Sequence, residues 1–199
     1  MNTLGAANLI AEARRLLAAL ESPLITEYLT QWPTGALCAP AVPAAIPGLR
    51  HLPAAADLAP AFSAPFARAL KSAAPALAWR RSYTPQTVGA EFWDNYGWTE
   101  FVGLTGPAPS ERLACGVMLL GPGVTYPLHQ HEAEEMYVPL SGIADWKMGE
   151  HAWEALPPGS VIHHPSNASH AMRTGDAALL ALYLWRSDDL AQKSQLDEQ

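Results

Sequence analysis

The first thirty residues carry apolar side chains at helical spacing. One set of positions falls on a single face of a helix: Leu9, Ile10, Ala13, Leu16, Leu17 and Leu20. Glu12 and Arg15 lie on the other side, so the pattern predicts an amphipathic helix that ends at residues 22–23. The same period continues over residues 24–32 and predicts a second, short helix.

Residues 33–66 combine repeated prolines with many alanines. Proline interrupts helices, and this stretch lacks the charge or the Gly/Ser bias of a disordered linker. We therefore expect an ordered, irregular stretch with short helices. Residues 57–77, where Phe62, Phe66 and Leu70 recur, are expected to be helical.

From residue 95 onward the pattern changes to short apolar runs bounded by glycine, proline, asparagine or aspartate. The predicted strands are 98–104, 112–120, 135–140, 144–148, 160–164 and 178–185. Several short strands of this kind indicate a sandwich or a barrel. The chain of 199 residues has the length of one domain with an appendage. We therefore divide it into a helical and Pro/Ala-rich N-terminal extension (1–94) and a β domain (95–199), whose polar end is expected to form a helical turn or to fray.

The segment YPLHQHEAEEMY, residues 126–137, reads as a strand with unusual side chains. Its odd-numbered polar residues are His129, His131, Glu135 and Tyr137. Because residues two apart on a strand share a face, these four side chains should point the same way if no bulge intervenes. Two imidazoles and a carboxylate form a three-ligand site for Zn, Fe, Mn or Ni, with a phenol beside it. The alternative is a solvated loop, and Glu132 and Glu134 are expected to face solvent.

Two glycines extend this segment into a longer motif. The chain has Gly123, then five residues to His129, one to His131, three to Glu135 and six to Gly142. This spacing resembles G(X)5HXH(X)3-4E(X)6G, the first motif of the cupin superfamily. The resemblance implies a mainly β fold, the cupin double-stranded β-helix or jelly-roll barrel, with an α-helical N-terminal extension in this chain.

A second segment resembles the second cupin motif, G(X)5PXG(X)2H(X)3N. Gly159, Pro165 and His170 match it, whereas Asn167 replaces a glycine and Thr174 replaces an asparagine. Asparagine is the residue best able to replace glycine in a left-handed turn. By this resemblance His170 is the fourth metal ligand.

His163 and His164 compete for the role of His170. They lie in the predicted strand 160–164, where one of two adjacent side chains must face inward. His163 is our candidate for a substrate contact or for a group that supports the metal ligands. The alternative is a partly exposed pair before a turn.

The pattern YxxHxHxxxExY, followed by the later histidine, is similar to that of the cupin-type dimethylsulfoniopropionate (DMSP) lyases of marine bacteria. Tyr126 and Tyr137 join the four ligands in this resemblance. It implies a metal-dependent lyase that cleaves a small zwitterionic sulfonium substrate to dimethyl sulfide and acrylate by β-elimination. It also implies one divalent transition metal ion (Fe, Zn or Mn) and catalytic roles for Tyr137, as general base, and for Tyr126.

This elimination has clear chemical requirements. A proton must leave the carbon next to the carboxylate, and a divalent cation that binds the carboxylate stabilises the charge that develops. A free phenol has a pKa of about 10, which a nearby cation lowers, so Tyr137 suits the base. The sulfonium leaves without protonation, and aromatic faces can hold its charge. The candidate faces are Trp185, Tyr183 and Tyr126, with Trp93 and Trp98 behind them.

Other interpretations stay open. Trp185 suits a core position in so apolar a strand, Tyr137 could be a buried tyrosine bonded to a carbonyl, and Tyr126 could hold the metal ligands in place. At the level of function, the alternatives are a cupin Fe(II) dioxygenase acting on a small organic acid and a non-catalytic ligand-binding cupin. The Pro-rich region is expected to pack over the mouth of the barrel as a lid.

Composition narrows the partners. A formal charge of −7 with only 12 Lys and Arg residues argues against nucleic-acid binding. No apolar run approaches the roughly 20 residues that span a bilayer, and the N-terminal residues do not resemble a signal peptide, so a cytoplasmic location is expected. Cys38 and Cys115 form no metal or disulfide pattern, and both are expected to be buried. A homodimer is compatible with the sequence.

Overall fold

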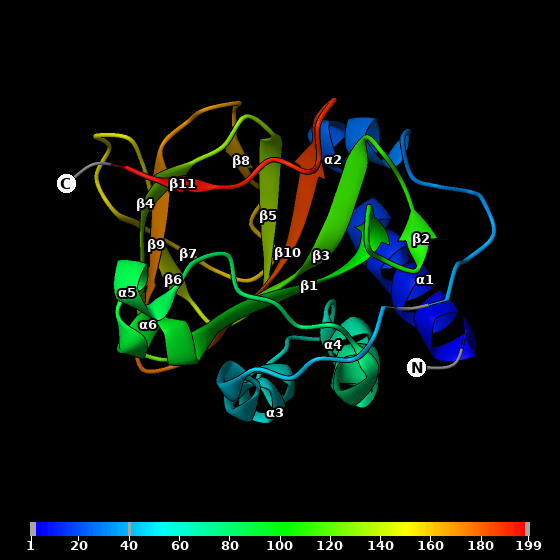
Figure 1. Cartoon of the computed structure of the whole chain (residues 1–199), viewed down its shortest axis with the longest axis horizontal. Coiled ribbons are helices and arrows are strands. Elements are labelled where there is room, and N and C mark those ends of the chain that lie inside the picture. Colours follow the sequence, from blue (N-terminus) through cyan, green and yellow to red (C-terminus); the bar gives the residue numbers. More distant parts are fainter. Residues whose placement is uncertain (1–2, 40, 198–199) are drawn as a thin grey trace.

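The computed structural model describes residues 3–39 and 41–197, in which a group of helices precedes a β domain (Figure 1). Helix α1 (Thr3–Ala19) buries Leu9, Ala13 and Leu16, as the apolar spacing predicted. Helix α2 (Pro23–Leu29) begins where Ser22 accepts a hydrogen bond from the backbone N–H of Ile25 at 3.5 Å. Both predicted N-terminal helices are therefore confirmed.

The Pro/Ala-rich stretch contains short helical pieces rather than one long helix. These are the 3-10 turn η1 (Pro47–His51), α3 (Leu52–Asp57), α4 (Ala64–Ala73), the 3-10 turn η2 (Ala74–Ala76), α5 (Pro85–Val88) and α6 (Ala90–Asn95). The prediction of a continuous helix over 57–77 is wrong because the chain breaks after α3 and begins again with a proline in the first turn of α4. Proline is tolerated there and not in a helix interior.

The β domain contains two sheets. The larger has the order β2 (Ala108–Pro109), β1 (Tyr96–Gly103), β3 (Leu113–Leu120), β10 (Leu179–Arg186), β5 (Glu134–Ser141) and β8 (Ile162–His164). The smaller has the order β11 (Gln195–Leu196), β4 (Thr125–Gln130), β9 (His170–Thr174), β6 (Ala144–Met148) and β7 (Glu154–Leu156). All six predicted strands are present. Strands β2, β7, β9 and β11 are additional. Within the polar end, Gln195–Leu196 form β11 rather than a helical turn, and residues 198–199 lie outside the described part of the chain.

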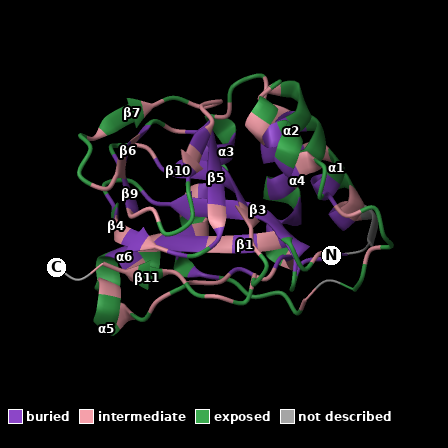
Figure 2. Cartoon of the chain, turned by 90° about the horizontal axis from the view of Figure 1, so that it is seen from above, coloured by how far each residue is buried: buried purple, intermediate pink, exposed green. Residues whose placement is uncertain are grey.

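Alternation along the strands separates two apolar cores. On β10, Leu180, Leu182 and Leu184 face the helices, whereas Ala181 and Tyr183 face the interior of the barrel. Figure 2 shows the buried residues concentrated in the strands and on the sides of the helices that face them. The larger sheet therefore has the helical extension on one face and the barrel interior on the other, because successive side chains of a strand point to opposite faces.

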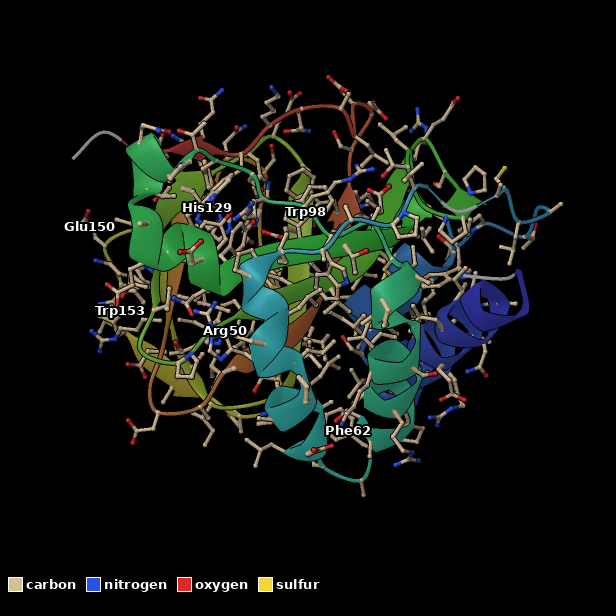
Figure 3. The ribbon with its side chains drawn as sticks, turned by 60° about the horizontal axis from the view of Figure 1, so that its bottom comes forward. Arg50, Phe62, Trp98, His129, Glu150 and Trp153 are labelled. Atoms are coloured by element: carbon tan, nitrogen blue, oxygen red, sulfur yellow. The ribbon has the colours of Figure 1, made fainter. Side chains whose placement is uncertain are left out.

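The Pro-rich stretch lies on the outside of the barrel. The backbone N–H of Cys38 donates to the carbonyl of Pro107 at 2.7 Å, and the hydroxyl of Ser63 donates to the carbonyl of Leu140 at 2.7 Å. Phe62, which is labelled in Figure 3, lies at the edge of the molecule and against Gly159. Cys115 is buried, but Cys38 is exposed, which corrects the expectation that both are buried.

Candidate functional site

The four predicted metal ligands come from three separate segments. His129 lies on β4, His131 follows that strand in a turn, and Glu135 lies on β5. His170 begins β9 and is the direct cross-strand partner of His129. The idea of one continuous strand over 126–137 is therefore wrong, since the chain turns over residues 131–133 before β5 begins. The four side chains nevertheless gather because β4 and β5 belong to facing sheets.

Each of the three histidines is held by the same kind of hydrogen bond. Nδ1 of His129 lies 2.8 Å from the carbonyl of Pro127, Nδ1 of His131 lies 2.8 Å from that of Ala133, and Nδ1 of His170 lies 2.8 Å from that of Ala168. A backbone carbonyl can only accept a hydrogen bond, so each Nδ1 carries the proton. In each neutral ring Nε2 then carries the lone pair that a metal ion can bind.

Two of the three Nε2 atoms lie close to one buried carboxylate. Nε2 of His131 lies 2.9 Å from Oε2 of Glu135, and Nε2 of His170 lies 3.1 Å from the same oxygen. The ligand atoms of His129, His131 and His170 lie within 4.8 Å of one another. All four side chains are buried, Glu135 to 1% exposure and His170 to 0%.

The charges of this cluster are strongly coupled. Burial works to raise the pKa of Glu135, but the charge and the hydrogen bond of His131 outweigh it and hold that pKa well below its usual range. Burial works to lower the pKa of His131, and the Glu135 carboxylate raises it above the ordinary value. Burial lowers the pKa of His129 well below its ordinary value. Glu135 is therefore ionised, and His129 is a neutral imidazole at neutral pH.

These residues fit a divalent metal ion. Among the described residues, Nε2 of His170 is buried without a hydrogen-bond partner, although a carboxylate oxygen lies 3.1 Å away. Two lone pairs at that separation repel each other unless a cation lies between them. Three imidazole nitrogens and a carboxylate oxygen are a donor set for transition-metal ions such as Zn, Fe or Mn.

His164, and not His163, belongs to this cluster. His164 is buried, its ring stacks on His170 with centroids 3.9 Å apart, and it forms a second group of possible ligands with Glu135 and His170. Burial lowers its pKa to about 4. His163 instead lies 2.7 Å from Oε1 of Glu134 and does not line the cavity, so its proposed substrate contact is not supported. Adjacent residues of a strand face opposite ways, and the position of β8 next to β5 decides which one faces in.

Aromatic residues surround the cluster in particular ways. The ring of Tyr126 stacks on His129 with centroids 4.0 Å apart, and its hydroxyl lies 3.2 Å from that of Tyr83 and 3.3 Å from that of Tyr96. Trp185 donates its indole N–H to Oε1 of Glu135 at 2.6 Å, and its ring lies 4.3 Å from that of His131. Trp185 thus supports a ligand in addition to lining the cavity, a role that sequence analysis missed.

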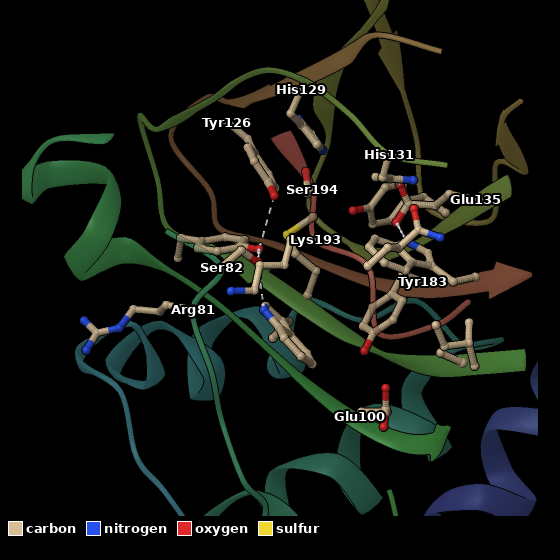
Figure 4. A pocket seen from close by; sticks show the side chains of 18 residues that line it. Arg81, Ser82, Glu100, Tyr126, His129, His131, Glu135, Tyr183, Lys193 and Ser194 are labelled. Carbon is tan, nitrogen blue, oxygen red and sulfur yellow. Dashed lines mark hydrogen bonds and ion pairs between the residues drawn. The ribbon is translucent and has the colours of Figure 1, made fainter. Parts of the chain in front are cut away.

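A cavity of about 330 Å³ opens beside the cluster (Figure 4). Its lining includes predicted site residues: Tyr126, His129, His131, Glu135, Tyr137, Tyr183 and Trp185. Tyr137 is 5% exposed, and burial together with the Glu135 charge raises its pKa well above the ordinary value. Trp98 and Glu100 line the cavity as well, whereas Trp93 does not.

The cavity is covered by the C-terminal segment (187–197) rather than by the Pro-rich stretch. Leu190, Gln192, Lys193 and Ser194 line it, and among the described residues none from 33–66 does. Oε1 of Gln192 accepts the backbone N–H of Ala133 at 3.0 Å, and strand β11 pairs with β4. The predicted lid is therefore wrong, because the Pro-rich stretch packs on the outside of the barrel.

The two facing sheets and the buried His/Glu cluster define a cupin barrel with a candidate metal centre. A cupin-2 domain protein from Rhodospirillum rubrum shares the fold, at 21% identity and a TM-score of 0.50 over 63% of this chain and 78% of that chain. The family model of the DMSP lyases matches residues 36–181. The chain therefore belongs to the DMSP lyase family, whose members are carbon–sulfur lyases, and the expectation of an enzyme of this class is confirmed.

Individual relatives agree with this assignment. The DMSP lyase DddQ of Ruegeria pomeroyi is 35% identical over 91% of this chain and 89% of its own length. The putative DMSP lyase DddL of Cereibacter sphaeroides is 34% identical over 61% of this chain and 51% of its own length. The crystal structure of DddQ from Ruegeria pomeroyi has a TM-score of 0.86 over 98% of this chain and 97% of that chain. A chain from the crystal structures of the DMSP lyases RdDddP and RnDddQII has a TM-score of 0.91 at 33% identity and covers both chains fully.

No helix within residues 3–39 and 41–197 has both the length and the apolar character that crossing a membrane requires.

Proposed function

We propose that this protein cleaves dimethylsulfoniopropionate to dimethyl sulfide and acrylate by β-elimination, with a divalent ion (Fe, Zn or Mn) as cofactor and Tyr137 as general base. Family membership and the relative DddQ support the substrate. One observation carries the metal: three histidines have Nδ1 tied to carbonyls and ligand atoms within 4.8 Å of one another, and Nε2 of two of them lies within 3.1 Å of Oε2 of Glu135. Family membership also favours a lyase over the dioxygenase and over the non-catalytic alternative.

His129, His131, His170 and Glu135 would hold the ion. A divalent ion held there would supply Lewis-acid chemistry: it would stabilise negative charge on the substrate carboxylate and favour the ionised form of a neighbouring phenol. The protein keeps these ligands oriented without it: Tyr126 packs flat on His129, and Trp185 donates a hydrogen bond to Glu135. Ordered ligands of this kind reduce the rearrangement that binding requires.

In this proposal Tyr137 removes the proton. It lies two residues after Glu135 on β5, so both side chains face the cavity. The phenolate oxygen takes the proton from the carbon next to the carboxylate, and the C–H electron pair forms the C=C bond of acrylate. The C–S bond breaks, and its electron pair leaves with sulfur as neutral dimethyl sulfide. Within the protein alone, burial and Glu135 raise the pKa of Tyr137, so this role requires the charge of a bound cation to outweigh both.

The test combines gas release with metal analysis. Protein stripped with a chelator and reloaded with Fe, Mn or Zn is given the substrate, and dimethyl sulfide is measured in the headspace with acrylate in solution. Tyr137→Phe should abolish both products while metal content, measured by mass spectrometry, stays at the wild-type level. Tyr28→Phe is the matched control because Tyr28 is buried and does not line the cavity.

Three outcomes separate the parts of the proposal. Normal product release by Tyr137→Phe would remove Tyr137 from the mechanism. Full activity of stripped protein would exclude the metal. A reaction that stops under anaerobic conditions would favour the dioxygenase, since elimination consumes no oxygen.

A further inference from the structure

The cavity extends from the histidine cluster across the larger sheet to strand β1. Four residues lie opposite one another on adjacent strands and form a row across the sheet. They are Glu100 on β1, Gly116 on β3, Tyr183 on β10 and Tyr137 on β5. Neighbouring strands lie about 4.8 Å apart, so the backbones at Glu100 and Tyr137 are separated by about 14 Å along this row. The cavity is thus elongated, and Glu100 lies at the end away from the cluster (Figure 4).

A bulge in β1 makes Glu100 the last residue of the strand that faces the cavity. Trp98 and Glu100 are two apart and both line it. Between Glu100 and Val102 the register with β3 shifts, and Phe101 and Val102 both join the core under the helices. An extra residue in one strand changes the face to which the following side chains point. Glu100 therefore leaves the strand on the cavity side, and its carboxylate lies beside Gly103, where an added Cβ atom would be 2.8 Å from Oε2 and 2.9 Å from Oε1.

Aromatic rings line this end of the cavity. A Cβ atom built on Gly116 would lie 2.5 Å from both Cε1 and the hydroxyl of Tyr183, so the Tyr183 ring lies across Gly116 in the direction of β1. Figure 4 shows the Tyr183 hydroxyl directed toward Glu100. The rings of Tyr183 and Trp98 meet edge to face, with centroids 6.3 Å apart and an interplanar angle of 87°.

The charge of Glu100 is available to a ligand. Its Oε1 accepts hydrogen bonds from the backbone N–H and the hydroxyl of Thr105, each at 2.7 Å, and from the N–H of Gly106 at 3.0 Å. Within the described part of the chain, Oε2 accepts none. Arg80 reaches the hydroxyl of Thr105 and packs on Trp98, but it does not line the cavity. The other carboxylate in the lining, Glu135, is bound to His131 and Trp185.

We propose that the charge of Glu100 attracts, from the far end of the cavity and without contact, the cationic end of a zwitterionic substrate whose carboxylate lies at the histidine cluster, with the rings of Trp98 and Tyr183 between them. This inference rests on the proposed function and deepens it. A sulfonium or a quaternary ammonium group has no N–H or O–H to donate, so charge and aromatic contact are the means of recognising it. A cation-binding cluster at one end and a carboxylate at the other orient a zwitterion and disfavour a simple anion.

The reaction itself predicts how Glu100 acts. As the C–S bond breaks, the sulfonium becomes a neutral sulfide, and its attraction to Glu100 weakens toward the transition state. Glu100 therefore contributes to substrate binding and not to the chemical step, which places its effect in KM rather than in kcat. Glu100 is a specificity-determining residue in this scheme.

The experiment uses Glu100→Gln, which removes the charge and keeps an Oε1 that can accept all three hydrogen bonds. Two unreactive carboxylates of the same shape are titrated calorimetrically into metal-loaded protein. The cationic ligand, 3-(trimethylammonio)propionate, carries a positive charge at its trimethylammonium end, and the tert-butyl ligand, 4,4-dimethylpentanoate, has no charge at that end. Wild-type protein should prefer the cationic ligand, and Glu100→Gln should reduce that preference about tenfold, or about 1.4 kcal/mol. The tert-butyl ligand, a simple anion, should bind to Glu100→Gln at least as well as to wild-type protein. Glu111→Gln, at an exposed position on the loop between β2 and β3, is the matched control and should behave as wild type.

Kinetics provide the second measurement. Glu100→Gln should raise KM for dimethylsulfoniopropionate about tenfold without lowering kcat. An unchanged preference between the two ligands, an equal loss of affinity for both, or a lower kcat at unchanged KM would overturn the inference. Wild-type protein that releases no dimethyl sulfide but still prefers the cationic ligand would overturn the proposed function and support the cation-binding end of the cavity.

Discussion

The hydrogen bond between Trp185 and Glu135 offers a direct test of how the metal centre is built. The two residues are cross-strand partners on β10 and β5, and the indole N–H lies 2.6 Å from Oε1 of a carboxylate that is 1% exposed. Trp185→Phe keeps a ring beside His131 but removes the donor. A buried charged group that loses one hydrogen bond is destabilised by about 1.5–3 kcal/mol. Loss of such a supporting contact lowers metal affinity about 10- to 100-fold.

Zinc affinity is measured by competition with a chromophoric chelator, and the stability of the metal-free protein by urea unfolding. Trp153→Phe is the matched control, since Trp153 packs on Arg173 with the guanidinium 4.6 Å from its ring centroid, at the outer surface and apart from His129 (Figure 3). Trp185→Phe should lose affinity and stability, whereas the control should lose neither. If Trp185→Phe binds zinc as tightly as the control, the histidines alone orient Glu135 and our reasoning about Trp185 is refuted.

Two further predictions concern stability. Asn167 has a φ of 59°, so Asn167→Ala should lower the free energy of unfolding by about 1 kcal/mol, whereas Asn167→Gly should leave it unchanged or raise it; equal urea midpoints for the two variants would contradict this. Burial works to raise the pKa of Glu134, but hydrogen bonds from Arg186 and His163 outweigh it and lower that pKa. This stabilisation is present above the unfolded pKa of about 4.3 and is lost as the pH falls through the lower folded value. The difference in urea midpoint between wild type and Glu134→Gln should therefore be largest near pH 7 and shrink in acid, and a difference that grows in acid would show that Glu134 has no such role.

Several features could be read from local spacing. The amphipathic α1 and the six main strands follow from apolar periodicity, which is a property of the residues within each element. The motif residues His129, His131 and Glu135 lie close in sequence and end close in space. Asn167 was predicted to suit a left-handed turn, and its positive φ agrees with that prediction.

The prediction that His129, His131 and Glu135 lie together was based on one continuous strand over residues 126–137. The three residues do lie together, but that strand does not exist. His131 lies in a turn, and it joins Glu135 because its Nδ1 is held by the carbonyl of Ala133. Parity within one strand could not foresee a change of sheet between β4 and β5. Such a change depends on how strands of two sheets pair, which a short segment does not reveal.

The sequence by itself determined which residue types could form a metal centre and where the two N-terminal helices and the six main strands lie, because these depend on neighbours along the chain. Only the tertiary structure decided that His164 rather than His163 faces the cluster, that Trp185 holds Glu135, and that the C-terminal segment covers the cavity. Each of these contacts joins segments that are far apart in the chain. Their register is set by packing of the whole barrel, and a shift of one residue would turn every side chain to the opposite face.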